Sequence, residues 1–328
     1  MKPWQQALAD SVMTSNDLLS RLGLDADQLG MVDSQPDFPV RVPIPFLNRI
    51  KRGDPEDPLL RQVLAISEER LATPGFSHDP LDERDGPLTG LLHKYRSRVL
   101  LIYRGGCAIN CRYCFRRHFP YSEQTLTARD IDSLIQYLES HPEVNEVIVS
   151  GGDPLMADDA SIAQLFGYLE SVQTIKRVRI HTRLPVVVPE RVTDALCDAI
   201  EVTRLPVITV LHCNHANEID ASVAQAVQKL RTVCRSVLNQ AVILKGVNDS
   251  IHSLVALSER LFEVGIDPYY LNVLDRVSGA HHFEVTDQTV RELHQGLLNA
   301  LPGYLVPKVV REVPGVGHKV LWKETTQT

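Results

Sequence analysis

Hydrophobic and polar positions change their rhythm near residue 90. Before that point, four leucines between residues 18 and 24 have roughly helical spacing, and prolines interrupt the chain at Pro55 and Pro58. We therefore expect residues 1–95 to form an N-terminal extension of short helices and loops.

Beyond residue 95, short apolar runs rich in β-branched residues alternate with longer amphipathic stretches. The apolar runs cover residues 99–103, 147–149, 178–181, 207–211, 237–244 and 269–274. The amphipathic stretches cover residues 128–140, 161–172, 190–200, 222–233 and 253–264. Strands that alternate with helices indicate repeated βα units on a parallel sheet. Eight strands would close a full barrel, so six predict either an open (β/α)6 partial barrel or a doubly wound sheet across residues 96–277.

The last part of the chain, residues 278–328, has a simpler pattern. One amphipathic stretch at 287–300 is followed by the sequence YLVPKVVREVPGVGHKV. We expect a C-terminal segment with one helix.

Composition excludes several functional classes. The chain has 328 residues, of which 44% are hydrophobic, with a formal net charge of −7 and a pI near 5.9. Such a charge gives no general attraction to nucleic acid or to anionic membranes. No apolar run reaches the ~20 residues that span a bilayer, and the N-terminus lacks the apolar stretch of a signal peptide. We therefore expect a cytoplasmic protein with neither a nucleic-acid nor a membrane partner.

Three of the six cysteines lie within eight residues. Cys107, Cys111 and Cys114 form a C-x3-C-x2-C motif directly after the first apolar run. In a reducing compartment such a motif indicates metal or redox chemistry rather than disulfides. Three thiolates can hold three irons of a [4Fe–4S] cluster and leave the fourth iron open for S-adenosylmethionine (SAM). Tyr113 fits the aromatic residue that the radical-SAM pattern places beside the adenine.

A structural zinc site is the alternative for the same cysteines. His118 would complete a Cys3His set, which would be closed and redox-silent. The sequence after the second apolar run, Ser150, Gly151, Gly152 and Asp153, favours the cluster. Glycines there let a ligand approach the backbone, and bare amides can hold the carboxylate of SAM. By itself, the same sequence is also typical of a tight turn.

These motifs together resemble the lysine 2,3-aminomutase family from about residue 40 onward. The matching stretches are GLLHKYRSRVLLIYRGGCAINCRYCFRRHFP, SGGDPL, RIHTRLPVVVP, NHANEID, LNQAVILKGVND, PYYL and PGYLVPK. CRYCFRRHFPY and the short C-terminus resemble the branch that makes β-lysine for modification of elongation factor P. The resemblance implies a radical-SAM (β/α)6 partial barrel and a C-terminal segment that binds pyridoxal phosphate (PLP). It also implies conversion of L-lysine to β-lysine, as the (R) isomer, through a 5′-deoxyadenosyl radical.

The resemblance implies cofactor-binding roles for five residues. Lys319 falls at the position of the catalytic lysine that binds PLP covalently, although the glycine run before it in the family is reduced here to PGVGH. Lys94 and Arg98 match a pair that binds the phosphate of PLP. His212 and Gln240 match pocket residues near the nucleoside of SAM.

Three further residues match positions that bind the substrate. Arg116 matches the arginine that binds the substrate carboxylate, a task that suits a bidentate guanidinium. Asp275 matches a carboxylate that binds the distal ammonium of lysine. Glu312 stands where the family has aspartate, and its additional methylene would push the carboxylate into the pocket. Without the resemblance, Lys319 would be interpreted as a solvated surface lysine and His212 as a core histidine.

The implied partners are free L-lysine, an electron donor such as flavodoxin or ferredoxin, and, functionally, elongation factor P with its lysyl-ligase. Two other functions stay open. A radical-SAM enzyme without PLP would leave Lys319 idle and would show no PLP absorbance band. A non-catalytic zinc-binding scaffold would be colourless after purification, whereas an iron–sulfur protein would be brown.

Overall fold

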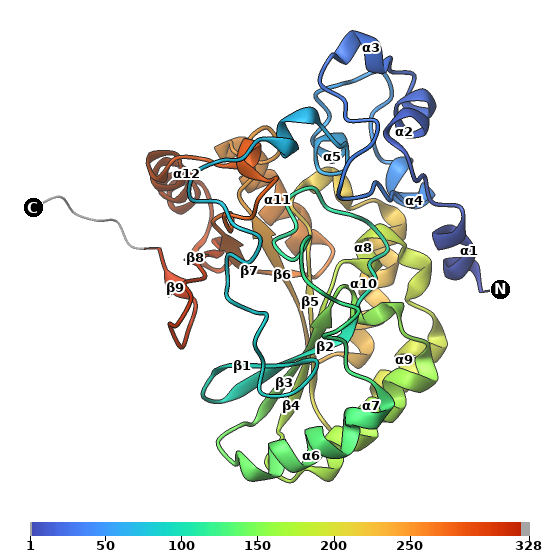
Figure 1. Cartoon of the computed structure of the whole chain (residues 1–328), viewed down its shortest axis with the longest axis vertical. Helices are drawn as coiled ribbons and strands as arrows, with labels where there is room; N and C mark the ends of the chain where they lie inside the picture. The colour runs from blue at the N-terminus through green and yellow to red at the C-terminus, as the bar shows by residue number, and fades with distance from the viewer. Residues whose placement is uncertain (1, 323–328) are drawn as a thin grey trace, which may run out of the picture.

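A computed structural model describes residues 2–322 and shows one open, mostly parallel sheet (Figure 1). In this part of the chain nine strands pair in chain order, from β1 to β9. The parallel strands are β2 (Arg98–Arg104), β3 (Glu146–Gly151), β4 (Arg177–Thr182), β5 (Val207–Leu211), β6 (Ser236–Val242), β7 (Asp267–Asn272) and β8 (Lys308–Arg311). The predicted partial barrel is confirmed, and β2 to β7 are its six predicted strands.

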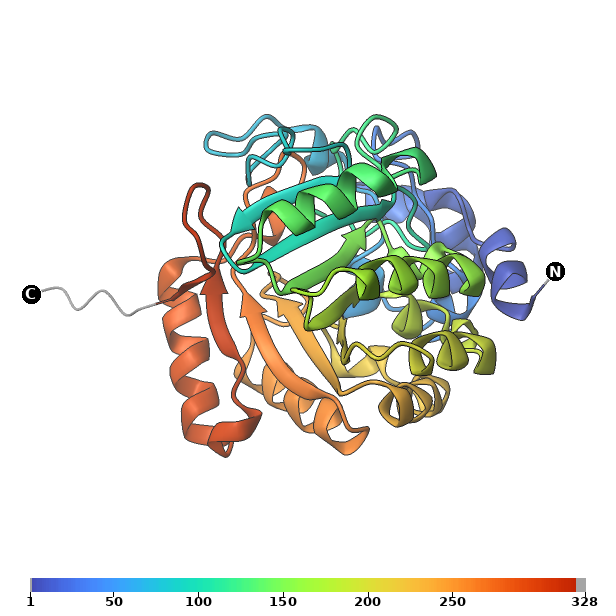
Figure 2. The same cartoon turned by 90° about the horizontal axis from the view of Figure 1, so that it is seen from below.

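Helices connect the parallel strands and cover the outer face of the curved sheet (Figure 2). These helices are α6 (Ile131–Ser140), α7 (Asp159–Ser171), α8 (Leu184–Val187), α9 (Asp194–Glu201), α10 (Ala221–Val233), α11 (Ile251–Glu263) and α12 (Asp287–Ala300). Each predicted amphipathic stretch overlaps one of them to within a few residues at either end. The helix predicted at 190–200 begins only at Asp194. Pro189–Arg191 forms a 3-10 turn instead, and the Thr193 side chain caps the first turn of α9.

The N-terminal extension consists of short helices, as predicted. They are α1 (Pro3–Ala9), α2 (Ser15–Leu22), α3 (Ala26–Leu29), α4 (Ile44–Leu47) and α5 (Pro58–Arg61). The apolar face of α2 is buried, with Leu18, Leu19 and Leu22 at most 1% exposed. This helix begins at the Thr14 cap and ends at Gly23, whose φ of 71° allows the chain to turn away.

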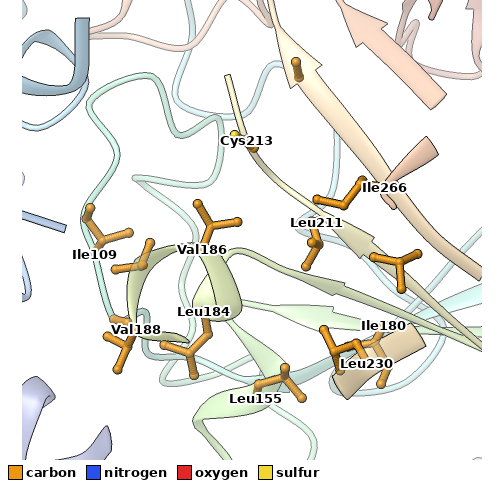
Figure 3. Close-up of a cluster of buried hydrophobic side chains, with 14 of the residues drawn as sticks. Ile109, Leu155, Ile180, Leu184, Val186, Val188, Leu211, Cys213, Leu230 and Ile266 are labelled. Atoms are coloured by element: carbon orange, nitrogen blue, oxygen red, sulfur yellow. The ribbon is translucent and has the colours of Figure 1, made fainter. Parts of the chain in front are cut away.

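The core lies between the sheet and its helices. All six residues of β3 are buried, as expected for a parallel strand that is covered on both faces. Figure 3 shows part of this core, where Ile180 of β4, Leu211 of β5 and Leu230 of α10 pack around the sheet. Each such side chain contributes about 1.5–3 kcal/mol through burial. No helix among the described residues is long and apolar enough to cross a membrane.

Three strands at the sheet ends were not predicted. β1 (Leu91–Tyr95) pairs antiparallel with β2, and β9 (Val320–Leu321) pairs antiparallel with β8. These strands and β8 have five residues or fewer, too few for a clear alternation of apolar and polar positions. In the β8–β9 pair Arg311 faces Val320, so the next residues outward, Glu312 and Lys319, come to lie opposite each other.

Candidate functional site

One cavity of about 350 Å³ occupies the centre of the curved sheet and reaches the carboxyl ends of its parallel strands. All of the predicted site residues line it. They are Lys94, Arg98, Cys107, Cys111, Tyr113, Cys114, Arg116, Ser150, Gly151, Gly152, Asp153, His212, Gln240, Asp275, Glu312 and Lys319. The structure therefore brings side chains from distant parts of the sequence to one place.

The cysteine loop follows β2 and is held by the N-terminal extension. Arg41 Nη1 donates to the Cys107 carbonyl at 3.0 Å. The backbone amide of Arg112 donates to the carbonyl of the buried Gln62 at 2.9 Å. The guanidinium of Arg112 forms an ion pair with Glu69. Residues of the N-terminal extension thus fix the backbone that carries the thiols.

The surroundings of the three thiols and of His118 bear on the choice between a cluster and a single zinc ion. Among residues 2–322, no three His, Cys, Asp or Glu side chains are grouped so that they could hold one metal ion. Thiolates of a [4Fe–4S] cluster bind different irons and need not converge on one point. His118, the fourth ligand of the zinc alternative, instead contacts the Ser278 carbonyl at 3.2 Å and stacks on His78 at 4.1 Å.

The electrostatics of the thiols also suits bound irons. Burial raises the pKa of the Cys107 thiol well above its ordinary value and that of Cys114 to about 11, and the neighbouring cysteines add to both shifts. Without a cation these thiols stay protonated at neutral pH. Positively charged irons would stabilise the thiolates, so the three residues fit the implied cluster.

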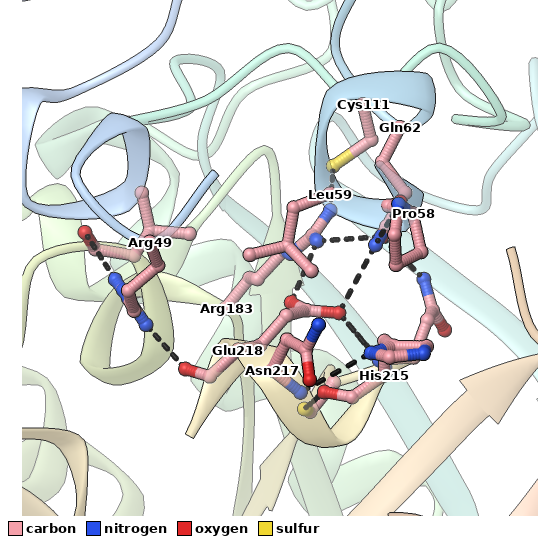
Figure 4. Close-up of polar contacts among 12 residues, drawn as sticks. Arg49, Pro58, Leu59, Gln62, Cys111, Arg183, His215, Asn217 and Glu218 are labelled. Atoms are coloured by element: carbon pink, nitrogen blue, oxygen red, sulfur yellow. Dashed lines mark hydrogen bonds and ion pairs between the residues drawn. The ribbon is translucent and has the colours of Figure 1, made fainter. Parts of the chain in front are cut away.

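A buried arginine directly after β4 contacts the cysteine loop (Figure 4). Arg183 Nη1 donates to Cys111 Sγ and to the Tyr113 hydroxyl, both at 2.6 Å. Its Nη2 donates to Gln62 Oε1 and to Glu218 Oε2, both at 2.8 Å. Because Glu218 balances its charge, Arg183 can remain buried beside a sulfur that becomes a thiolate on binding iron.

The glycines at the end of β3 allow close packing against the end of β2 and the cysteine loop. A Cβ on Gly152 would lie 2.6 Å from the Gly106 carbonyl oxygen. Gly151 has a φ of 116°, and its Cβ would lie 2.4 Å from the Arg104 carbonyl oxygen. Any side chain at either position would therefore push the turn away from the cluster loop.

The carboxylate of Asp153 is occupied within the chain. Its donors are the Thr182 hydroxyl (2.7 Å) and the amides of Leu155 (3.0 Å), Arg183 (2.8 Å) and Leu184 (2.9 Å). These bonds fix the end of β3 to the end of β4. The structure thus gives Asp153 a positioning role, and a direct contact with SAM stays a prediction.

Lys319 is held by two partners at the edge of the cavity. Its Nζ donates to Asn272 Oδ1 at 2.9 Å and lies 3.2 Å from Glu312 Oε2. Glu312 also accepts a hydrogen bond from the Tyr95 hydroxyl. Glu312, which was predicted to bind the substrate, therefore also orients Lys319, which was predicted to bind PLP. The sequence did not reveal this contact.

Asp275 lines the cavity without a hydrogen bond to its carboxyl from any described residue. Burial raises the pKa of this carboxyl to about 7, against the opposing effect of Lys319 and with a further increase from Glu312. An incoming ammonium would supply the missing partner, as the predicted substrate role requires.

This pKa predicts how lysine binding depends on pH. Because only ionised Asp275 pairs with an ammonium, and the carboxyl is neutral below about pH 7, affinity for lysine should fall as pH is lowered. Since bonding to PLP would remove the Lys319 ammonium that lowers this pKa, we expect the dissociation constant to level off only at or above pH 7 and to rise about tenfold per unit below that point. Titrations of the PLP-loaded enzyme between pH 6 and 8 measure this. An equally steep dependence in Asp275→Asn would contradict the assignment.

The other predicted cofactor residues have varied surroundings. Arg98 stacks over the Tyr95 ring, 4.0 Å from its centroid, and makes no ion pair among the described residues. Gln240 Nε2 lies 2.8 Å from His212 Nε2 and 3.5 Å from His181 Nδ1. Burial lowers the pKa of His212 to about 3, so the ring is neutral and can accept a hydrogen bond as well as donate one.

Several cavity residues were missed from the sequence. Arg183 and Asn272 follow or end strands, and the rule that ligands bind at the carboxyl ends of parallel strands could have found them. Tyr95 was hidden in a strand that was not predicted. Glu83, whose carboxylate contacts both Lys94 and Arg116, lies in a charged loop and gave no signal.

The chain is similar in sequence to several known proteins. Residues 101–257 match the Radical SAM superfamily. The L-lysine 2,3-aminomutase of Escherichia coli (strain K12) is 48% identical over 95% of this chain and 92% of that protein. The enzyme of the same name from Haemophilus influenzae (strain ATCC 51907 / DSM 11121 / KW20 / Rd) is 45% identical over 98% of this chain and 96% of its own length. The enzyme of the same name from Buchnera aphidicola subsp. Baizongia pistaciae (strain Bp) is 41% identical over 97% of this chain and 94% of its own length.

Proposed function

Since the chain belongs to the L-lysine 2,3-aminomutase family, we propose that it converts L-lysine to β-lysine in this cavity. The observation that carries the proposal is that the cysteine loop and Lys319, which lie more than 200 residues apart in the sequence, line the same cavity. A radical-SAM enzyme without PLP would have no use for a lysine at this position.

The chain's own residues would bind and orient the substrate and cofactors. Cys107, Cys111 and Cys114 would hold the cluster, and Lys319 would bind PLP. When bound, the cluster and SAM supply one-electron radical chemistry, and PLP supplies a conjugated ring attached to the substrate amine. The protein would contribute orientation, so that one carbon of the substrate faces the radical source.

Side chains of both charge signs line the cavity and suit lysine, which carries a carboxylate and two amines. Arg116 would bind the α-carboxylate, and Asp275 would pair with the distal ammonium, for which its carboxyl has no other partner among the described residues. Glu312 would orient Lys319 Nζ for PLP, because its Oε2 lies 3.2 Å away.

Finer features are proposed from the sequence resemblance. We propose that the product is (R)-β-lysine, that it serves modification of elongation factor P, and that flavodoxin or ferredoxin supplies the electron. The motif CRYCFRRHFPY supports this branch of the family. We also propose that the enzyme works in the cytoplasm.

One anaerobic assay tests the proposal. Enzyme with lysine, SAM, PLP and dithionite should form β-lysine, and chiral separation should identify the (R) isomer. Omission of either SAM or PLP should stop the reaction. Formation of β-lysine without PLP, or none with every component present, would contradict the proposed function.

A chemical label tests the PLP site separately. Because PLP bonds to a lysine amine, borohydride reduction of the PLP-loaded protein should attach a pyridoxyl group to Lys319. Peptide mapping by mass spectrometry locates the label. A label on the exposed Lys308 of β8, or on Lys323, which lies outside the described residues, would show that Lys319 is the wrong residue.

A further inference from the structure

Glu83 lies where two predicted anion-binding side chains meet. Its Oε2 accepts a hydrogen bond from Arg116 Nε at 2.6 Å, and its Oε1 lies 3.1 Å from Lys94 Nζ. The side chains of Glu83 and Arg116 are each 8% exposed. Burial acts to raise the pKa of the Glu83 carboxyl, but the two cations outweigh it and hold the pKa below its ordinary value. The carboxylate is therefore ionised, and both of its oxygens are in use.

Contacts of the loop around Glu83 fix the position of this carboxylate. Asp82 has a φ of 54°, and among the described residues it alone has a positive φ without being glycine. Such a backbone persists where its surroundings hold it in place. The Asp79 carboxylate accepts a hydrogen bond from the backbone amide of Glu83 at 3.0 Å. An isolated β-bridge between Ser77 and Val277 connects the loop to the segment after β7.

The contact leaves a defined edge of Arg116 for a ligand. Glu83 occupies Nε, whereas Nη1 makes only a long contact of 3.5 Å with Ser150 Oγ. The guanidinium also stacks over the Phe115 ring, 4.8 Å from its centroid. A guanidinium binds a carboxylate through two parallel N–H groups, so the Nη1–Nη2 edge stays available for a bidentate contact.

We propose that Glu83 is a positioning residue that fixes Arg116 for the α-carboxylate of the substrate and couples this orientation to Lys94. The inference rests on the proposed function, because it takes the carboxylate of lysine as the ligand of Arg116. Because Arg116 and Lys94 hold both of its oxygens, Glu83 would act through Arg116 rather than bind the substrate itself. Its effect is to prevent rotation of the guanidinium, which would otherwise have to be ordered on each binding event.

The test compares L-lysine with L-lysinamide, in which a neutral amide replaces the carboxylate. Enzyme loaded with PLP, cluster and SAM is titrated without reductant, and the absorbance of bound PLP gives both dissociation constants in the absence of turnover. In Glu83→Gln the single amide oxygen cannot bind both Arg116 and Lys94. We therefore expect the preference for L-lysine over L-lysinamide to fall about ten- to a hundredfold.

Matched variants separate positioning from folding. Asp85→Asn removes an exposed carboxylate from the same loop and should keep the wild-type preference. Glu83→Ala should lose the preference as Glu83→Gln does. Adding Glu83→Gln to Arg116→Lys should reduce the preference no further than Arg116→Lys alone, because both changes act on one contact.

Each other outcome has a distinct meaning. If both Glu83 variants weaken the two ligands equally, the preference is unchanged and the positioning role is overturned. A preference that rises would also overturn it, because Glu83 would then compete with the substrate carboxylate. A wild-type enzyme that does not respond to L-lysine would instead overturn the proposed function on which the inference rests.

Discussion

Replacing Cys111 with alanine is expected to abolish the reductive cleavage of SAM. Three thiolates leave one iron open for SAM, and a cluster with only two protein ligands would lose a second attachment point. Cys111 is also the sulfur that contacts Arg183, so the change removes a thiolate and leaves the buried cation without this partner. After anaerobic reconstitution the intact protein should contain about four irons and about four sulfides per chain. In the variant both contents should be much lower.

Chromatographic detection of 5′-deoxyadenosine measures the cleavage. Cys107→Ala and Cys114→Ala should behave in the same way. Cys197, on α9, does not line the cavity, so Cys197→Ala is a matched control that should keep both the cluster and the cleavage. If Cys111→Ala still cleaved SAM, the cysteine motif would not be the ligand set of the cluster.

The barrel was predictable because parallel strands covered on both faces are almost continuously apolar. β3 illustrates this, since the run 147–149 is buried throughout and stands out from the polar residues around it. β8 and β9 have only four and two residues, and their pairing depends on contacts with strands far away in the sequence. Periodicity over so few positions does not distinguish a strand from a loop.

The site was predictable to the extent that residues stand in motifs. The cysteines have a spacing that carries chemical meaning by itself, whereas Gly-Gly-Asp gains its meaning from following the cysteine motif. Glu83 and Tyr95 acquire their positions only through folding, because their partners, Arg116 and Glu312, come from other elements. The opposite case is Asp153, which stood in a motif but has its oxygens bound by the chain itself.

Asp275→Asn is expected to cripple the mutase while leaving the cluster and PLP in place. The ammonium of lysine must be paired if it enters a cavity with little water, and Asp275 has no other hydrogen-bond partner among the described residues. Removing one member of a buried pair costs about 3–5 kcal/mol, or roughly two to three orders of magnitude in lysine binding or turnover. Asp267→Asn, at the exposed start of β7, is the matched control and should be neutral.

The Glu312 variants then show whether this residue acts on the substrate, on Lys319 or on both. Glu312→Gln should lower activity as Asp275→Asn does, and it should also weaken PLP binding, because the partner of Lys319 Nζ loses its charge. Glu312→Asp keeps the charge on a shorter side chain, so its effect should be mild. Steady-state kinetics and PLP absorbance distinguish these effects. Full activity in both amide variants, Asp275→Asn and Glu312→Gln, would exclude these carboxylates as the site of the distal ammonium.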